Sequence, residues 1–518
     1  MEFNNPSEIV KELNFGQEAN SKIMQGVEKL SSAVKSTLGA SGKCVIYEDA
    51  LGRPVITKDG VTVAESVVLL DPVENIGATL IKEAARNTVK EAGDGTTTST
   101  VLAHAILQTA IESDADSRTI KNGILSACDK VVDYLNKNKK RITKSMLNQV
   151  AAISCNNDSK LGDKIAQAFK SVGKDGVVLM EDSDTNETHV EFVDGVQFDS
   201  SLKSPHLVTD KSKNIAVLDN PYVLIVSSPI PNIRRIQNIL EHVIKKKRSL
   251  LIVAEVDQQP LSTLLANKVK GNIKVNVVDL PGFGPTREDT IQDLAILTGA
   301  IVINEQLGDD FDFIDADCLG EVERAVTDDK NTVLQIIESP AVEQRIKEVS
   351  NKIKEEKNGY FKKKLEQRLS MLTGKVGIIK VAGNSKIELK EKKDRVEDAI
   401  YATKAAYKEG IVPGGGVALL NAATLINAEN AGEEILLKAI KWPYATILEN
   451  AQLEYVEPMT AGTGLNVITG EAVEMIDAGI IDPVLVTKSA LKNAVSVATT
   501  ILSADCIISN IRVQNASS

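Results

Sequence analysis

The sequence has 518 residues, and 43% of them are hydrophobic, which is ordinary for a globular protein with several cored domains. Its formal net charge is −11, and no basic block stands out. Sequence-independent binding to nucleic acid requires clustered Lys and Arg, so the composition excludes a nucleic-acid partner.

The cysteines and histidines do not form a recognisable framework. The five cysteines are an odd number without a CxxC pair, and they lie far apart at Cys44, Cys128, Cys155, Cys318 and Cys506. The four histidines show no metal-ligand spacing. These patterns predict buried free thiols in a reducing compartment, rather than disulfides or a zinc site.

Targeting and membrane signals are weak in this chain. The first 15 residues contain neither a signal-peptide apolar core nor an Arg-rich transit pattern. No apolar run approaches the roughly 18 residues that span a bilayer. We therefore expect a cytoplasmic protein with no membrane partner.

In chain order, the first 112 residues predict a helix, a hairpin and two further helices. Ile23, Val27, Leu30 and Val34 recur at helical spacing. A turn at Gly52 separates two short apolar runs that predict strands at 44–47 and 54–57. The helices that follow are predicted at 76–91 and 97–112.

The middle of the chain predicts a compact α/β domain. Short apolar runs that predict strands occur at 222–227, 250–254, 275–280 and 300–304. Helices are predicted between them at 233–246 and 261–269. Residues 341–372 predict an exposed helical hairpin, interrupted at Gly359. Beyond residue 385 the chain is helical again, so we expect a multidomain α+β fold with an α/β domain inserted into a mostly helical one.

The strongest local signal is the run Gly93-Asp94-Gly95-Thr96-Thr97-Thr98, which opens a predicted helix. The glycines permit close approach of the backbone to a ligand, and the threonines place amides and hydroxyls at a helix N-terminus, where phosphate binds. Asp94 can hold Mg²⁺ beside that phosphate. A capped helix after a glycine turn explains the same residues equally well.

Two more glycine turns and two acids favour a nucleotide site. Thr37-Leu38-Gly39 follows the first helix, and Gly414-Gly415-Gly416 precedes a later one. Asp59 and Asp398 are candidates for orienting and activating water, although each alone is also an ordinary surface acid. The segment 39–44 lacks the spacing of a Walker A loop.

Several long stretches, in the same order, resemble the group I chaperonin (chaperonin-60) family over nearly the whole chain. The most distinctive are TLGASGK (37–43), VITKDGVTVA (55–64), KEAGDGTTTSTVLA (90–103), LPGFGPTREDTIQDLAILTGA (280–300), KEKKDRVEDAIYATKAA (390–406) and EGIVPGGGVALL (409–420). The segments PGFG and VPGGGVAL favour group I over group II.

The resemblance implies a chaperonin ATPase with ATP and Mg²⁺ as cofactors, and with K⁺ as a further candidate. It assigns to the ATP site Thr37, Leu38, Gly39, Lys58, Asp94, Gly95, Thr96, Thr97, Thr98, Ile153, Ser154, Gly414, Gly415, Asn466, Ile480 and Asp482. Asp94 is expected to coordinate Mg²⁺, while Asp59 and Asp398 are expected to assist the attacking water.

The resemblance also implies three domains. These are an equatorial ATP-binding domain (1–140 and 409–518), an intermediate hinge domain (141–193 and 377–408) and an apical domain (194–376). An apical surface for clients and lid is expected at Leu202, Leu207, Ile236, Leu240, Leu261 and Leu265, with the alternative that either Ile236 or its helical neighbour Ile239 faces the domain core. The implied partners are unfolded polypeptides, a small co-chaperonin lid and further copies of the chain in one or two heptameric rings. The protein is then expected in a bacterial cytoplasm, or in the host cytoplasm if a virus encodes it.

Some positions depart from the family pattern. Gln237 replaces a usual leucine of the client strip, and Ser200 and Lys386 replace a usual Arg–Glu pair. Residues 445–464 form a shorter segment than usual, which leaves open whether one ring or two assemble. Two other functions also stay open: a client-holding ring without effective ATP turnover, and a small-molecule kinase that uses the same nucleotide site.

Overall fold

The computed structural model describes residues 11–155, 158–173, 176–211, 214–282, 287–305, 308–309, 314–337, 339–356, 358–458 and 460–510. The chain divides into two compact units. The first comprises Met1–Gln167, Asp182–His189 and Val381–Ser518, and the second comprises Ala168–Glu181 and Val190–Lys380. Both chain ends therefore build one unit, which confirms the predicted multidomain α+β fold. The finer division into three domains stays a prediction.

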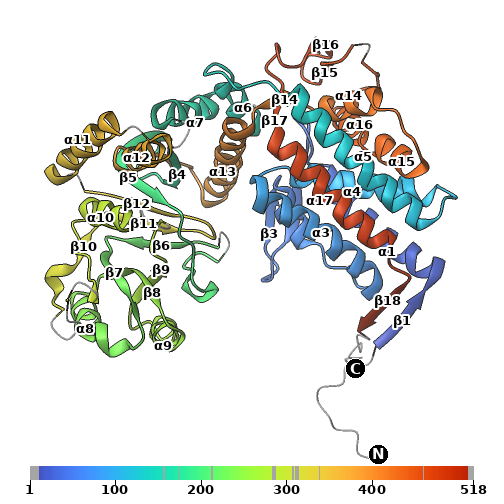
Figure 1. The fold of residues 1–518 in the computed structure, drawn as a ribbon. Helices are drawn as coiled ribbons and strands as arrows, with labels where there is room; N and C mark the ends of the chain where they lie inside the picture. Colours follow the sequence, from blue (N-terminus) through green and yellow to red (C-terminus); the bar gives the residue numbers. More distant parts are fainter. Residues whose placement is uncertain are drawn as a thin grey trace, which may run out of the picture. The chain divides into compact units, whose positions relative to one another are not determined.

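The first unit is mostly helical (Figure 1). Its helices are α1 (Gly16–Lys35), α2 (Gly60–Ser66), α3 (Pro72–Ala92), α4 (Thr96–Ile111), α5 (Ser117–Asn138), α6 (Met146–Ser154), α13 (Lys386–Glu409), α14 (Val417–Leu425), α15 (Ala431–Ala439), α16 (Trp442–Asn450) and α17 (Val484–Leu502). Helix α7 (Ser159–Val172) contributes residues to both units. Aliphatic side chains of α1, α3, α4, α5, α15 and α17 share one core, as the low aromatic content predicts.

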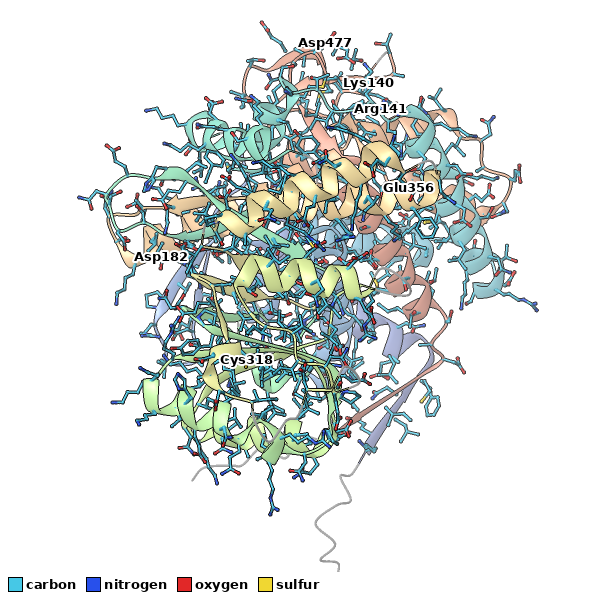
Figure 2. The ribbon with its side chains drawn as sticks, turned by 60° about the vertical axis from the view of Figure 1, so that its left-hand side comes forward. Lys140, Arg141, Asp182, Cys318, Glu356 and Asp477 are labelled. Carbon is cyan, nitrogen blue, oxygen red and sulfur yellow. The ribbon has the colours of Figure 1, made fainter. Side chains whose placement is uncertain are left out.

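Short antiparallel strand pairs complete the described part of this unit. They are β1 (Lys11–Phe15) with β18 (Cys506–Asn510), β2 (Val45–Glu48) with β3 (Pro54–Thr57), β14 (Ile411–Pro413) with β17 (Ile481–Pro483), and β15 (Thr463–Asn466) with β16 (Glu471–Glu474). The backbone of Lys140, labelled in Figure 2, exchanges two hydrogen bonds of 2.9 Å with that of Ile411. This contact fixes the chain after α5 beside the start of β14.

Capping residues set the ends of the helices next to the candidate site. Pro72 is pre-set for the first turn of α3, and Asp71 accepts hydrogen bonds from the backbone N–H groups of Val73 and Glu74. The same helix ends at Gly93, whose φ of 76° lies in the left-handed region. The chain can therefore reverse direction between α3 and α4 within the motif that the sequence analysis selects.

The second unit is built on two sheets. The first sheet has the strand order β10-β7-β8-β9, from β7 (Tyr222–Ile230), β8 (Ser249–Val256), β9 (Lys274–Val278) and β10 (Gly320–Glu321). The second has the order β4-β13-β5-β12-β11-β6, from β4 (Val177–Asp182), β5 (His189–Phe198), β6 (Ala216–Asp219), β11 (Arg324–Thr327), β12 (Thr332–Gln335) and β13 (Lys375–Val381). Strands β7, β8 and β9 are parallel, so helices must connect them.

Helices cover both faces of the parallel strands. They are η2 (Ile233–Ile236), α8 (Gln237–Lys246), α9 (Gln258–Val269), α10 (Arg287–Thr298), α11 (Pro340–Glu355) and α12 (Gly359–Leu372), with short turns η1 (Pro205–Leu207) and η6 (Ala316–Cys318). Side chains of α8 and α9 pack on one face with Leu224 and Ile252, whereas those of α10 and α11 pack on the other with Val223 and Leu251.

The sequence predicts most of these elements within a few residues, but the strand at 300–304 is wrong. Only Ile303 forms a bridge, with Val226 of β7. On the same edge of β7, β10 pairs with Tyr222 and Val223 and so occupies the first two residues of that edge. No helix in the described ranges combines the length and the apolar character needed to cross a bilayer.

Candidate functional site

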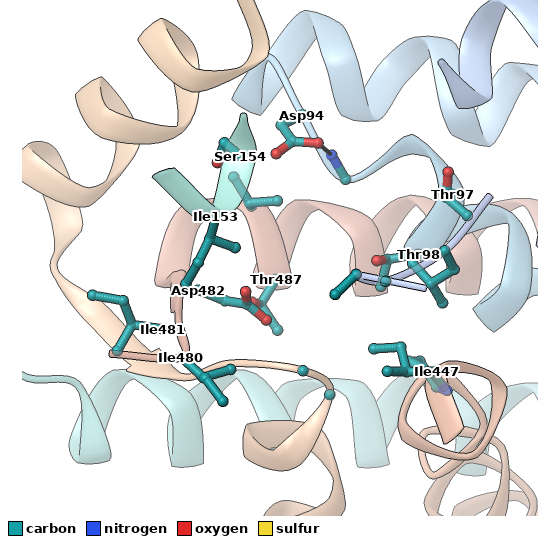
Figure 3. A pocket seen from close by; sticks show the side chains of 18 of the residues that line it. Asp94, Thr97, Thr98, Ile153, Ser154, Ile447, Ile480, Ile481, Asp482 and Thr487 are labelled. Carbon is teal, nitrogen blue, oxygen red and sulfur yellow. Dashed lines mark hydrogen bonds between the residues drawn. The ribbon is translucent and has the colours of Figure 1, made fainter. Parts of the chain in front are cut away.

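A cavity of about 490 Å³ in the first unit brings together segments that lie far apart in the sequence. Seventeen of the eighteen residues predicted for ATP binding and hydrolysis line it: Thr37, Leu38, Gly39, Lys58, Asp59, Asp94, Gly95, Thr96, Thr97, Thr98, Ile153, Ser154, Asp398, Gly415, Asn466, Ile480 and Asp482. Figure 3 shows Asp94 and Thr97 on one side of the cavity and Ile447 and Ile480 on the opposite side.

The N-terminus of α4 opens on this cavity without a side-chain cap. Its N-cap residue is Gly95, with φ 91°, and Thr96, Thr97 and Thr98 form the first turn. The Thr97 hydroxyl lies 3.4 Å from that of Thr37, so the two loops meet here. The first N–H groups of a helix without a cap favour an anion, because the helix dipole is positive at this end.

Gly95 cannot be replaced without a collision. An added Cβ would lie 2.7 Å from Cγ1 of Val486 on α17, and the positive φ disfavours any other residue. The backbone N–H of Gly95 donates to the carboxylate of Asp94, as the dashed line in Figure 3 marks. The motif thus packs tightly on α17 while Asp94 stays in the cavity lining.

Asp59 has a fixed orientation at the cavity wall. Its carboxylate caps α2 by accepting hydrogen bonds from the backbone N–H of Val61 at 3.2 Å and of Thr62 at 2.9 Å. The hydroxyl of Thr62 donates to the same carboxylate. These bonds hold the charged group in one position beside the cavity.

Burial and mutual repulsion disfavour ionisation of the carboxylates in the cavity. Asp94 and Asp398 are half-buried, and both line the cavity. Burial, followed by the charges of Asp94 and Asp59, raises the pKa of Asp398 well above its usual range. Burial and the Asp59 charge also raise the pKa of Asp94, although the N–H of Gly95 opposes this shift.

Asp482 connects β17 to the glycine turn before α14. Burial and the charge of Asp94 raise the pKa of Asp482 to about 7, while hydrogen bonds from the N–H groups of Gly415 and Gly416 oppose the rise. Its carboxylate therefore satisfies the donors of the glycine turn and orders that wall of the cavity.

The charge balance of the lining fits a bound cation. Six acids line the cavity, Asp59, Asp94, Glu391, Asp394, Asp398 and Asp482, against two bases, Lys58 and Arg395. A polyphosphate would be repelled unless a cation came with it. In the described ranges, no three His, Cys, Asp or Glu side chains gather to hold a metal alone. Mg²⁺ usually takes only one or two carboxylates and completes its shell with water and phosphate, so Asp94 fits that ion.

The opposite end of the cavity is apolar, and the sequence analysis identified only some of the residues that line it. Besides Ile480, its lining includes Ile447, Leu465, Val467, Ile468 and Met475. The hydroxyl of Tyr444 donates to the carbonyl of Val456 and accepts from the N–H of Leu465, both at 3.3 Å. These residues carry no motif, because isolated apolar side chains in a sequence are indistinguishable from core positions.

The structure corrects the prediction for Gly414. This residue does not line the cavity; its N–H donates to the carbonyl of Ile480 at 2.9 Å, and an added Cβ would lie 2.9 Å from the nitrogen of Ile481. Its neighbour Gly416 lines the cavity instead. Gly414 is therefore required for close packing of β17, one residue away from the lining.

The structure also corrects two positions of the predicted client surface in the second unit. Leu207 and Ile236 are fully buried in the core beneath α8 and α9, so they offer no apolar surface. Ile236 ends the 3₁₀ turn η2, and its side chain therefore points inward rather than along the outer face of α8. The other four predicted leucines are half-buried at the rim of that core, at Leu202, Leu240, Leu261 and Leu265.

The model of the TCP-1/cpn60 chaperonin family matches residues 30–512 of this chain. Among solved structures, the chain is similar to the chaperonin gp146 from the bacteriophage EL 2 (Pseudomonas aeruginosa), crystallised in the presence of ATP-BeFx. One crystal form aligns with a TM-score of 0.71 at 22% identity, and another with 0.64 at 21% identity. Each alignment covers 96% of this chain and 99% of that chain. The chain belongs to the TCP-1/cpn60 chaperonin family.

Proposed function

We propose that this protein is an ATP-hydrolysing chaperone that assembles into a heptameric ring, captures unfolded polypeptides and releases them into a closed chamber. The observation that carries the proposal is the cavity of the first unit, where the uncapped start of α4 faces a set of acids. The similar gp146 structures were determined in the presence of ATP-BeFx, which supports a nucleotide as the occupant.

The acids divide naturally into two roles in hydrolysis. Asp59 is fixed as the cap of α2 and orients the attacking water. Asp398 accepts a proton from that water, and its raised pKa matches this task. Water attacks the terminal phosphorus, the bond to the bridging oxygen breaks, and ADP leaves. The α4 N–H groups stabilise the charge on the phosphates.

Asp94 is the proposed Mg²⁺ ligand, and Mg²⁺ would neutralise phosphate charge in this acidic cavity. K⁺ remains a second candidate cofactor. The apolar end, with Ile447 and Ile480, suits the flat face of a nucleotide base.

The client surface that we propose is the apolar rim of α8, α9 and the segment before η1. It comprises Leu202, Leu240, Leu261 and Leu265. Burial of apolar surface stabilises a complex by about 25 cal/mol per Å² regardless of sequence, which suits unfolded chains. Each rim is small, so several rims in one ring add avidity.

Exposed sheet faces in the first unit support assembly into a ring. On the β1–β18 pair, Leu13, Phe15 and Ile508 are between 55% and 61% exposed. On the β2–β3 pair, Ile46 is 67% and Ile56 is 49% exposed. Isolated two-stranded sheets are marginally stable and leave open edges, so both pairs suit strand pairing with neighbouring copies.

We further propose that a small co-chaperonin lid closes the chamber, and that the protein works in the cytoplasm of a bacterium or, if a virus encodes it, of the host. The proposal includes no nucleic-acid or membrane partner.

Steady-state phosphate release with Mg²⁺ and ATP tests the proposal. Asp398→Ala should lower the turnover at least about 100-fold while nucleotide binding remains, since a positioned general base contributes that much. The matched control is Asp477→Ala, which removes an exposed carboxylate next to the cavity, and it should leave turnover unchanged.

The same assay separates the two alternative functions. If the protein is a ring that holds clients without ATP turnover, the wild-type protein would release no phosphate. A small-molecule kinase would release ADP only when its acceptor was added. Either result would replace the proposed function.

A further inference from the structure

The second unit carries a cluster of lysines that the proposed function does not use. We call it the basic edge, and it comprises Lys245, Lys246, Lys247, Lys270 and Lys274. The first three end α8 or follow it, and the last two lie between the end of α9 and the start of β9. All five side chains belong to exposed residues.

The fold brings these two lysine segments together. Strands β7, β8 and β9 are parallel and adjacent, and α8 and α9 pack on the same face of them. Both helices therefore end where β8 and β9 begin, and there Ser249, the first residue of β8, pairs with Lys274, the first residue of β9. Because Lys246 and Lys270 are 24 positions apart, the sequence alone shows only two short basic segments.

The lysines of the basic edge form no ion pairs with described residues. Among the described residues, none of its five lysines lies within ion-pair distance of a carboxylate, whereas the neighbouring Arg248 pairs with Glu321 at 2.9 Å. Lysines at helix C-termini interact favourably with the helix dipole, which accounts for Lys245 and Lys246. It does not account for Lys247 and Lys274, which lie outside the helices, on a protein whose net charge is −11.

The apolar positions of both helices lead directly into the basic edge. On α8, Leu240 is followed one turn later by Ile244, which is 47% exposed. On α9, Leu261 and Leu265 are followed at the same spacing by Val269, which is 77% exposed. Residues four apart lie on one helix face, so an apolar strip and the lysine cluster are continuous.

This arrangement favours a polypeptide over a nucleic acid. Single-stranded nucleic acid is bound by a positive groove together with aromatic side chains on which bases stack. Two aromatic rings beside this edge already have partners: Tyr222 and His242 pack edge to face at 5.8 Å, and the guanidinium of Arg248 covers the Tyr222 ring at 4.0 Å from its centroid. An apolar strip that ends in lysines instead matches a peptide with an apolar segment next to acidic residues.

We propose that the basic edge selects clients in which an apolar segment is flanked by acidic residues. This inference rests on the proposed function, because it refines the client class of the same apical rim. The lysines contribute attraction to the acidic flank, while the leucines bind the apolar segment without regard to sequence.

Peptide binding to the full-length protein, measured by fluorescence anisotropy, tests the inference. Three labelled peptides share one apolar core and carry flanks of Glu, Gln or Lys. Exposed ion pairs each contribute a factor of roughly 2 to the binding constant. About three such pairs should therefore make the Glu-flanked peptide bind about 10-fold more tightly than the Gln-flanked one. The preference should disappear in about 1 M salt, where charges are screened beyond about 3 Å.

A charge-matched pair of variants assigns the effect to the basic edge. Lys245→Gln, Lys246→Gln and Lys270→Gln combined should remove the preference for the Glu flank and leave binding of the Gln-flanked peptide unchanged. The control combines Lys347→Gln, Lys352→Gln and Lys354→Gln on α11, which packs on the opposite face of the sheet. It should keep the preference.

The outcomes separate this inference from the proposed function. If no peptide binds, the client surface itself is wrong. If all three peptides bind equally, or if the control variant also loses the preference, the basic edge does not select clients. A single-stranded DNA that competes as well as the Glu-flanked peptide would make the edge a nucleic-acid site instead.

Discussion

The carboxylate of Asp59 borders the cavity and caps α2 in the same conformation. Asn is as good an N-cap as Asp, but it carries no charge. Asp59→Asn should therefore keep the thermal stability of the protein and lower ATP turnover about 10-fold or more. Melting curves and phosphate release measure the two effects separately.

Asp71 is the matched control for this substitution. It caps α3 by the same two backbone hydrogen bonds, and it does not line the cavity. Asp71→Asn should change neither stability nor turnover. Equal loss of activity in both variants would mean that Asp59 acts only through the helix that it caps.

The pKa of Asp482 predicts a pH dependence of stability. Its pKa is about 7 in the folded protein and 3.8 in the usual reference state, so the folded state binds this proton more tightly. The resulting stabilisation is complete below about pH 4 and is lost as the pH rises to about 7. Without nucleotide and Mg²⁺, the melting temperature should fall over this interval.

Asp482→Asn should make that fall smaller, because the neutral amide has no proton to lose. Asp94 and Asp398 have raised pKa values as well, so part of the fall should remain. An unchanged pH profile in the variant would show that Asp482 is already ionised at low pH in the folded protein.

The residues of the site were predictable where several of them are adjacent in a motif. The glycine and threonine run that includes Asp94 predicts a turn followed by the start of a helix, and the structure has both. Tyr444 and Ile447 were missed because their chemistry is that of core residues. Gly414 was misplaced because three consecutive glycines do not indicate which of them faces the cavity.

At the scale of elements, the contact between α4 and α17 explains why Gly95 precedes the first threonine. Gly95→Ala adds a methyl group 2.7 Å from Val486 and forces a non-glycine residue to φ 91°. We expect it to lower the free energy of unfolding by about 2–4 kcal/mol and to weaken ATP binding.

Gly52→Ala separates the cost of the positive φ from the cost of the collision with Val486. Gly52 has φ 74° but nothing within 4 Å of an added Cβ. This control should cost only about 1–2 kcal/mol from backbone strain. Equal losses in chemical denaturation would mean that the α4–α17 contact relaxes around the methyl group.

The limits of element prediction have physical causes in this chain. The buried runs of β7 and β8 were clear because strands covered on both faces are continuously apolar. The run at 300–304 is similarly apolar, but it forms a single bridge to β7, because composition alone does not decide how many residues of a run will pair. Ile236 and Leu240 both lie in the helix predicted at 233–246, and only tertiary packing decides that Ile236 is buried while Leu240 is half-buried.

At the scale of the whole molecule, the exposed apolar face of the β1–β18 pair predicts self-association. Phe15→Glu combined with Ile508→Glu should convert rings into monomers in sedimentation velocity, because buried unpaired charges oppose the interface. Leu425→Glu is the control, since Leu425 is 59% exposed but lies on α14. Rings that survive the double substitution would place the interface elsewhere.

The order of the motifs predicted the overall organisation, with both chain ends in one unit and an α/β unit inserted. The basic edge was beyond prediction, because parallel strands bring its two lysine segments to one place only after folding. Features that depend on adjacent residues were therefore predicted, and features that depend on the meeting of distant segments were not.

The central claim is that ATP hydrolysis in the first unit drives the release and folding of bound clients. Its most direct test is the yield of a chemically denatured enzyme refolded with this protein, with and without ATP. The claim predicts that ATP raises the yield with wild type, and that Asp398→Ala binds the client but gives no such rise. ATP consumption by wild type without any gain in refolded enzyme would contradict it.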